Sequence, residues 1–496
     1  MFESSKLNPE QTLTYRQIII LLCTAIFAAF LYLGMCLFVF RIGFPLDDAW
    51  IHQTYARNLA LNHQWSFYPG IVSGGSTSPL WTALLAIGFL MGLSPLAWGY
   101  ICGFTCILFI GILAELFFRN TLPVYRSAIP WVGCIFMFEW HLTWAAFSGM
   151  ETIIYILCIL IVFILLLAGS KKYLLLGILI GISIWIRPDG LLLLLPAFLS
   201  ILFKHEQSNE KIRNFFSSLF GFSIFFLPYL LFNLVISGTP WPNTFYAKQA
   251  EYVNWQNSPI ITRIFYFSLQ FFQGINLLFI PGFIKNLYRS ITGRKWEIIF
   301  IYAWLIGYAG IYIARLPVYQ HGRYEMPALA VFLLLGFPGF IEDVNYFFVS
   351  KAKILKTMYF FVFIVILAIS TIFGAYTFSA DTALIESQMV DTAKWVSVNI
   401  PLNETIAAHD IGALGFYGNH QIVDLAGLVS PEIVPIMNDD HKILSYLDEK
   451  KVRYLAAFIN WRPLLTSTSD KIFIISDIRF LQNTSNSMAV FQRNAP

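Results

Sequence analysis

Long apolar runs separated by short polar segments dominate the first 380 residues of the chain. A helix that crosses a bilayer needs about 20 mainly apolar residues. About eleven runs are of this kind, and we expect each to form a transmembrane helix. They start near residues 17, 96, 127, 151, 173, 190, 215, 262, 297, 325 and 358. The first, Ile18–Phe40, is too long for a signal-peptide core and is predicted to remain as an uncleaved span.

A twelfth apolar stretch, Leu80–Leu93, has only about 14 residues. A stretch of that length is typical of an interfacial or re-entrant helix rather than a span. The distinction matters, because counting it as a span would move every later loop to the opposite side of the membrane. We therefore place it in a long first outer loop, which extends from Arg41 to about Pro95 (residues 41–95).

The pattern changes after Ala380, where the remaining 116 residues are far more polar. Helical spacing over Asp381–Asn399 ends at Pro401. Four short buried strands and one helix are expected beyond it. The strands are Thr405–Ala408, Gln421–Asp424, Tyr454–Phe458 and Lys471–Ile475, and the helix is Lys442–Lys451. This alternation indicates a small α/β domain. We thus expect two units, residues 1–380 and 381–496.

Composition narrows the class of protein. Apolar residues make up 57% of the chain and charged residues 12%, whereas a soluble domain has about 25% charged residues. A compact soluble core cannot hide that much apolar surface. Disorder and a nucleic-acid-binding domain are excluded as well. The predicted fold class is a polytopic α-helical membrane protein with a small C-terminal α/β domain.

The distribution of basic residues supports this arrangement of spans. With a cytoplasmic N-terminus, one set of loops holds 16 of the 32 Lys and Arg residues, and the other holds 7 before the last span ends. An excess of Lys and Arg marks cytoplasmic loops. The C-terminal domain is then extracytoplasmic. The basic-rich set is Lys6, Arg16, Arg119, Arg126, Lys171, Lys172, Lys204, Lys211, Arg213, Lys285, Arg289, Arg294, Lys295, Lys351, Lys353 and Lys356.

Two adjacent carboxylates, Asp47 and Asp48, follow the first span directly. One interpretation is a helix N-terminus, where acidic side chains are favoured by the helix dipole. The other is a general base at the membrane face, which takes the proton of an acceptor hydroxyl as the hydroxyl attacks a sugar carbon. One of the two could instead orient the acceptor or hold a cation. His52 and Arg57 follow on the same predicted helix and are either solvated or part of the site.

Nine segments, spread in order over nearly the whole chain, resemble the GT-C superfamily of glycosyltransferases. Among these, the chain is most similar to the arabinofuranosyltransferase-like group of bacterial cell-envelope enzymes. Each segment is weak evidence alone, and together they are fairly specific. The segments are Asp47–Ile51 (DDAWI), Tyr55–Ala60 (YARNLA), Gly75–Thr82 (GSTSPLWT), Ser148–Thr152 (SGMET), Arg187–Gly190 (RPDG), Pro242–Lys248 (PNTFYAK), Arg323–Pro327 (RYEMP), Asp410–Gly415 (DIGALG) and Val423–Leu428 (VDLAGL).

The resemblance implies the GT-C fold and a multi-pass enzyme of the inner (plasma) membrane. Such an enzyme transfers a monosaccharide from a polyprenyl-phosphate donor to an envelope glycan, glycolipid or glycoprotein, with inversion and without an enzyme nucleophile. In this superfamily the acidic motif of the first outer loop supplies the base, and that motif falls on Asp47 and Asp48. The implied partners are the donor lipid, the acceptor and the bilayer, and no nucleic acid.

Basic residues on the predicted outer face are candidates to hold the phosphate, which gains negative charge as it leaves. The candidates are Arg323, Lys248 and Arg187, with His321 and Tyr324 nearby in the sequence. The structural alternative for Lys248 and Arg323 is a side chain that extends to the membrane interface.

Four acidic or imidazole side chains complete the set of candidates. Asp189 pairs with Arg187 to close a tight turn in the alternative interpretation, and Glu151 begins a helix. His409 and Asp410 end a predicted strand, where anchoring of a loop is the alternative to contact with the acceptor. The C-terminal domain has two compatible roles, carbohydrate binding and positioning of the acceptor.

No cofactor is established by the sequence, which contains no His-Glu-x-x-His motif and no cysteine cluster. A divalent cation at Asp47 and Asp48 is compatible with the adjacent carboxylates but is not indicated by them alone. The rival functions are a transporter or lipid-linked sugar flippase and a non-catalytic scaffold. Transporters often consist of repeated halves with charged groups near the bilayer midplane. Here the halves do not repeat, and the charges gather at one face.

Overall fold

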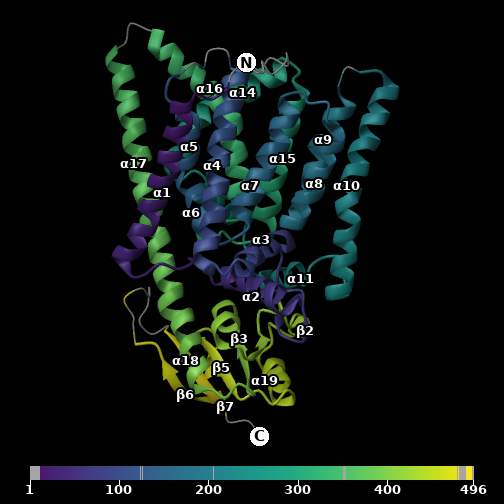
Figure 1. Ribbon diagram of the computed structural model, residues 1–496, viewed down its shortest axis with the longest axis vertical. Coiled ribbons are helices and arrows are strands. Elements are labelled where there is room, and N and C mark those ends of the chain that lie inside the picture. Colours follow the sequence, from purple (N-terminus) through teal and green to yellow (C-terminus); the bar gives the residue numbers. More distant parts are fainter. Residues whose placement is uncertain are drawn as a thin grey trace.

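The computed structural model describes residues 12–122, 125, 127–204, 206–349, 353–476, 479 and 487–493. Most of them form a bundle of helices, and a five-stranded sheet covers one end of it (Figure 1). Lys6, Arg126 and Lys351 of the predicted cytoplasmic set lie outside the described residues.

The predicted apolar runs are helical. Their helices are α1 (Tyr15–Val39), α4 (Pro95–Thr121), α5 (Trp131–Phe138), α6 (Trp140–Phe147), α7 (Thr152–Leu167), α8 (Tyr173–Ile186), η1 (Pro188–Leu193), α9 (Leu194–Leu202), α10 (Ser208–Ser237), α13 (Ile260–Phe271), η2 (Gly274–Phe279), α14 (Ile280–Thr292), α15 (Trp296–Arg315), α16 (Met326–Val349) and α17 (Lys353–Leu384). Side-chain hydrogen bonds to the backbone fix where two of these helices begin. Thr14 and Gln17 form a capping box at α1, and Ser94 accepts a hydrogen bond from the Ala97 backbone N–H at α4.

By length and composition, six helices of the described chain can cross a membrane, and the bent pair α13 and α14 raises this to seven if it forms one span. The bend between the two is 98°. The other predicted spans form shorter apolar helices, α7, α8 and η1–α9, or are divided at Glu139 into α5 and α6. The fold class of a polytopic helical membrane protein is therefore confirmed, with fewer full-length spans than the eleven predicted.

The first outer loop folds between the bundle and the sheet. It contains α2 (Asp47–Asn62), the hairpin strands β1 (Ser66–Tyr68) and β2 (Ile71–Val72), and α3 (Pro79–Leu90). Helix α3 has 12 residues, which is too short to span, as predicted for Leu80–Leu93. Helix α2 packs against α3, and α2 and α11 (Asn243–Glu251) line a common cavity at this end of the bundle (Figure 1). Helix α12 (Val253–Gln256) follows α11, and η3 (Gln320–Gly322) precedes α16. The hairpin was not predicted.

The C-terminal sheet has the order β4-β3-β5-β7-β6. Strands β3, β4 and β5 are parallel to one another, and β7 is antiparallel to β5 and β6. Three predicted strands have the observed ends, whereas β7 was not predicted. The elements are β3 (Thr405–Ala408), η5 (Leu414–Gly418), β4 (Gln421–Asp424), η6 (Pro431–Ile433), α19 (Asp440–Glu449), β5 (Tyr454–Phe458), α20 (Pro463–Ser467), β6 (Ser469–Ile474) and β7 (Met488–Arg493).

One continuous helix joins the bundle to the sheet. Helix α17 passes through the π-helical segment η4 (Ile385–Val390) into α18 (Asp391–Asn399), and Thr357–Asn399 forms 43 uninterrupted residues. The helical spacing predicted over Asp381–Asn399 is therefore confirmed, and this helix continues α17 without a break. No Pro or Gly interrupts residues 375–399, so nothing in the sequence ends the helix there.

Candidate functional site

A cavity of about 380 Å³ lies where the first outer loop, α11 and the ends of several bundle helices meet. Eight of the thirteen predicted site residues line it: Asp48, His52, Glu151, Arg187, Asp189, Lys248, Arg323 and Tyr324. They come from parts of the chain up to 276 positions apart. The fold therefore brings most of the candidates to one place.

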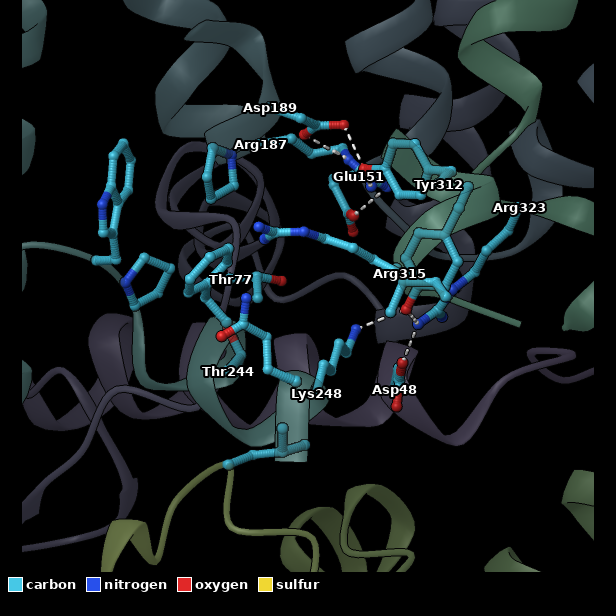
Figure 2. Close-up of a pocket in the computed structure, with 18 of the residues that line it drawn as sticks. Asp48, Thr77, Glu151, Arg187, Asp189, Thr244, Lys248, Tyr312, Arg315 and Arg323 are labelled. Atoms are coloured by element: carbon cyan, nitrogen blue, oxygen red, sulfur yellow. Dashed lines mark hydrogen bonds and ion pairs between the residues drawn. The ribbon is translucent and has the colours of Figure 1, made fainter. Parts of the chain in front are cut away.

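Arg187 holds one side of the cavity together (Figure 2). Helix α8 ends there in an extended residue, and Pro188 then starts a 3₁₀ turn. The buried guanidinium pairs with Asp189 at 3.1 Å and Glu151 at 3.4 Å, and donates a hydrogen bond to the Tyr312 hydroxyl at 2.9 Å. The predicted turn-closing pair is thus present, and it also faces the cavity. Both partners are carboxylates, so the charge of Arg187 is largely neutralised.

A second polar group centres on Tyr324, whose ring centroid lies 5.4 Å from the Arg187 guanidinium carbon. Its hydroxyl accepts hydrogen bonds from Arg323 at 2.8 Å and from the Lys248 ammonium at 2.6 Å. Arg323 also pairs with Asp48, with Nη2 2.6 Å from Oδ2. Burial alone would raise the pKa of Asp48, but Arg323 and Lys248 lower it to about 2. Asp48 is therefore ionised at neutral pH, and 34% of its side chain is exposed.

Asp47 has a different environment although it is the neighbouring residue. Its carboxylate accepts hydrogen bonds from the backbone N–H groups of Gly412 at 2.6 Å and Ala413 at 2.8 Å, and it is buried. A Cβ at position 412 would lie 2.0 Å from the Asp47 carbonyl oxygen, so only glycine fits there. Burial, and then the charge of Asp410, raises the pKa of Asp47 to about 7. Asp47 thus attaches α2 to the C-terminal domain and does not line the cavity.

His52 connects the first outer loop to Glu151. Its Nδ1 lies 3.0 Å from the Ser76 hydroxyl, and its Nε2 lies 3.4 Å from Glu151 Oε2. Ser76 in turn shares a hydrogen bond of 2.8 Å with Thr82 on α3. Two of the segments that resemble the GT-C superfamily therefore meet at this buried imidazole.

The structure does not place Arg57 or His321 in the cavity lining. Arg57 donates hydrogen bonds to the carbonyl oxygens of Phe416 and Gly415 and so binds α2 to the C-terminal domain. His321 pairs with Asp381 at 2.8 Å.

His409 and Asp410 also lie outside the lining. The two imidazole nitrogens of His409 lie 3.5 Å from Glu251 on α11 and from Asp410. Burial would lower the pKa of His409, but hydrogen bonds to Asp410 and Glu251 raise it to about 10. This cluster therefore joins α11 to the end of β3.

Arg315 lines the cavity and was not predicted. Figure 2 shows its side chain reaching into the cavity between the Arg187 group and Lys248. Its guanidinium lies 5.8 Å from the Phe245 ring, and within the described parts of the chain no ion pair or hydrogen bond engages it. The available signal was its position as the last residue of an apolar run, on the side of the membrane that carries the other candidates.

A protein metal site is usually built from several His, Cys, Asp or Glu side chains that lie close together. Among the residues with described placement, no group of three or more His, Cys, Asp and Glu side chains is arranged to hold a metal ion.

Comparison with solved structures shows the fold. ArnT from Cupriavidus metallidurans bound to undecaprenyl phosphate is 11% identical, with a TM-score of 0.60 over 97% of this chain and 98% of that chain. The Archaeoglobus fulgidus oligosaccharyltransferase in the apo form is 12% identical, with a TM-score of 0.63 over 90% of this chain and 70% of that chain. Both are GT-C membrane glycosyltransferases. The predicted GT-C fold of this multi-pass membrane protein is thus confirmed, and the arabinofuranosyltransferase-like subgroup stays a prediction.

Sequence comparison adds one match. A family model described as a domain of unknown function, DUF8728, matches residues 381–491, which is most of the C-terminal domain. No curated protein matches the chain.

Proposed function

We propose that this chain is an inverting glycosyltransferase that moves a monosaccharide from a polyprenyl-phosphate donor to an envelope glycan, glycolipid or glycoprotein. The reaction takes place on the extracytoplasmic face of the inner membrane. One observation carries the proposal: the ionised carboxylate of Asp48 shares a cavity with Lys248, Arg315 and Arg323. The likeness to ArnT, whose structure contains undecaprenyl phosphate, supports the choice of a lipid-phosphate donor.

Asp48, rather than Asp47, is assigned as the base. Both oxygens of Asp47 are engaged by backbone N–H groups, and the residue does not line the cavity. Asp48 faces the cavity and is partly exposed. A base must lie within hydrogen-bond reach of the proton it removes, and only Asp48 of the two meets that condition.

Arg315, Lys248 and Arg323 are assigned to the donor phosphate. Arg315 has the largest free hydrogen-bonding capacity of the three, since its five N–H donors are unengaged within the described residues. Lys248 and Arg323 both donate hydrogen bonds to the Tyr324 hydroxyl, and both line the same cavity as Arg315. Arg187 is assigned as a positioning residue, because Glu151 and Asp189 already neutralise it.

In the proposed step, the acceptor hydroxyl oxygen forms a bond to the anomeric carbon while the bond from that carbon to the phosphate oxygen breaks. The electron pair goes to the phosphate, and the hydroxyl proton goes to Asp48. Before the donor binds, Arg323 holds Asp48 and weakens it as a base. A bound phosphate competes for Arg323, which raises the basicity of Asp48. Binding of the donor thereby activates the base.

Apolar residues complete the donor side of the cavity. Leu192 on η1, with Ile311 and Leu316 at the end of α15, line the same space as the cations. A polyprenyl phosphate needs a charged pocket for its head and an apolar surface for its first isoprene units, and this cavity offers both.

The direct test uses the purified full chain in liposomes with synthetic polyprenyl-phosphate donors, each carrying a different labelled sugar, and an envelope extract as acceptor. We expect label to pass to the acceptor for one donor, with release of free polyprenyl phosphate. Movement of an intact donor across the liposome without cleavage would show a flippase instead. Absence of both transfer and cleavage over the panel would contradict the proposal.

A further inference from the structure

A second cavity, of about 290 Å³, lies outside the first, and none of its lining residues takes part in the transfer step described above. We call it the outer cavity. It is formed between the β1–β2 hairpin of the first outer loop and the edge of the C-terminal sheet at β4, with α19 closing one side. Its volume is near the lower limit of small-molecule sites, which begins at about 300 Å³. It is large enough for one or two sugar rings.

The lining of the outer cavity mixes aromatic and planar polar side chains. Tyr68 of the hairpin and Tyr446 of α19 are half-buried, while Gln421 of β4 and Glu432 are exposed. The Tyr446 hydroxyl donates a hydrogen bond of 2.8 Å to Glu432 Oε1, which fixes the ring. Lys450 Nζ lies 5.5 Å from the centroid of the same ring.

This mixture fits a saccharide better than other ligands. A sugar ring has an apolar C–H face, which packs on aromatic rings, and a rim of hydroxyls, which bind the amide of Gln421 and the carboxylate of Glu432. One acidic and one basic side chain give the site no net charge, so a phosphate is not favoured. A lipid tail would need an apolar lining throughout, which Gln421, Glu432 and Lys450 do not provide.

The two cavities share a thin wall. Leu428 lines the first and the next residue, Val429, lines the outer one, while Gly75 lines the first and Ser73 the outer one. The Tyr55 hydroxyl joins the wall, since it lies 2.6 Å from the Ser73 hydroxyl and accepts a hydrogen bond from Gly75 N–H at 2.8 Å. A ligand in the outer cavity is therefore within a few residues of the proposed site of transfer.

We propose that the outer cavity binds a sugar unit of the acceptor, one or more units from the hydroxyl that reacts. This inference rests on the proposed function and deepens it, since it makes the acceptor an oligosaccharide or polysaccharide chain. The C-terminal domain then supplies Gln421, Glu432 and Tyr446 to select that chain, and the hairpin supplies Tyr68.

The kinetic test compares Gln421→Ala and Tyr446→Ala with Gln492→Ala. Gln492 is an exposed glutamine on β7 of the same sheet and does not line the outer cavity. For envelope glycan as acceptor, we expect both cavity variants to raise the acceptor KM about tenfold, which corresponds to a loss of about 1.4 kcal/mol. The donor KM and kcat stay within twofold of wild type, and Tyr446→Phe, which keeps the ring, stays closer to wild type than Tyr446→Ala.

A binding measurement separates this inference from the proposed function. Envelope oligosaccharides of two to four units are mixed with the detergent-solubilised full chain, and contact is read by saturation-transfer NMR. We expect contact with wild type, Asp48→Asn and Gln492→Ala, and loss of contact with Gln421→Ala and Tyr446→Ala. Sugar transfer that is unaffected in both cavity variants overturns the inference while the proposed function stands. Variant-sensitive binding by a wild type that transfers no sugar overturns the proposed function alone. Absence of contact with wild type overturns the inference.

Discussion

Asp47 and Asp48 are adjacent in the chain, yet their carboxyl groups have opposite pKa shifts. Both lose water, which raises a carboxyl pKa. Asp48 gains Arg323 and Lys248 as neighbours, and its pKa is lowered. Asp47 gains two backbone donors but also the repulsion of Asp410 and Asp48, and its pKa rises. The surroundings therefore divide the pair into an ionised cavity residue and a buried contact between domains.

The raised pKa of Asp47 predicts how stability varies with pH. The group has a pKa of about 7 when folded and about 3.9 when unfolded. Between these values the folded protein keeps a proton that the unfolded chain releases, so stability falls as pH rises from 4 to 7 and then levels off. We expect the Tm in detergent to be lower at pH 8 than at pH 5, and the difference to shrink in Asp47→Asn. An equal difference in this variant and wild type would contradict the assignment.

Arg315 provides a second prediction at this scale. A charge-assisted hydrogen bond to a charged group contributes about 1.5–3 kcal/mol, so Arg315→Ala is expected to raise the donor KM by about 10- to 150-fold. The Tm should change little, since the side chain is exposed. Arg213→Ala, an exposed arginine with a 3.8 Å pair to Glu210, serves as the control. Unchanged donor KM in Arg315→Ala would exclude a phosphate contact.

The sequence predicted which residues gather at the site better than it predicted how they pair. Because charged residues are rare in this apolar chain, Arg187, Lys248 and Arg323 stood out as candidates. All three line the cavity. Arg57 and His409 were candidates on the same grounds, but Arg57 contacts the C-terminal domain, and His409 belongs to that domain and contacts Glu251 on α11. That difference depends on the docking of two units, which no local pattern encodes.

At the scale of elements, the helix that runs from α17 to α18 is fixed to the start of the first outer loop. Arg41 pairs with Glu386 at 2.7 Å and with Asp391 at 2.6 Å. Glu386 is buried, so its charge depends on Arg41. The continuous helix and this clamp together set the position of the sheet relative to the bundle.

We expect Arg41→Ala to lower the free energy of unfolding by about 2 kcal/mol, because it leaves a buried carboxylate without its partner. Glu386→Gln in the same chain should recover part of that loss, since the amide carries no charge. The measurement is chemical unfolding in detergent of wild type, both single variants and the double variant. Additive losses in the double variant would show that the two side chains are not coupled.

Element prediction succeeded for short segments whose consecutive residues are buried. Thr405–Ala408, Gln421–Asp424 and Tyr454–Phe458 were predicted with the observed ends because all three are runs bounded by turn signals. Strand β7 was not recognised, although it pairs with both β5 and β6. The break of one predicted span at Glu139 was missed as well. There the Glu139 carboxylate accepts a hydrogen bond from the Leu142 backbone N–H and so begins a new helix, α6.

At the scale of the whole molecule, the sheet and the first outer loop lie at one end of the bundle, and α1 begins at the other (Figure 1). Basic residues predicted to be cytoplasmic fall in the loops before α10 and α15. By the charge rule, we expect alkaline phosphatase fused after Arg493 to be active and the same fusion after Arg119 to be inactive. The reverse pattern would place the proposed site in the cytoplasm.

The central claim is that Asp48 acts as the base in sugar transfer, and one comparison tests it most directly. Asp391 is a matched control, since it also pairs with an arginine at 2.6 Å and 35% of its side chain is exposed, against 34% for Asp48, but it lies outside the cavity. Initial rates of transfer are measured for wild type, Asp48→Asn and Asp391→Asn, with the Tm of each. The prediction is a loss of at least about 100-fold in Asp48→Asn alone, at a temperature where the measured Tm values show all three proteins folded. Transfer by Asp48→Asn at the wild-type rate would contradict it.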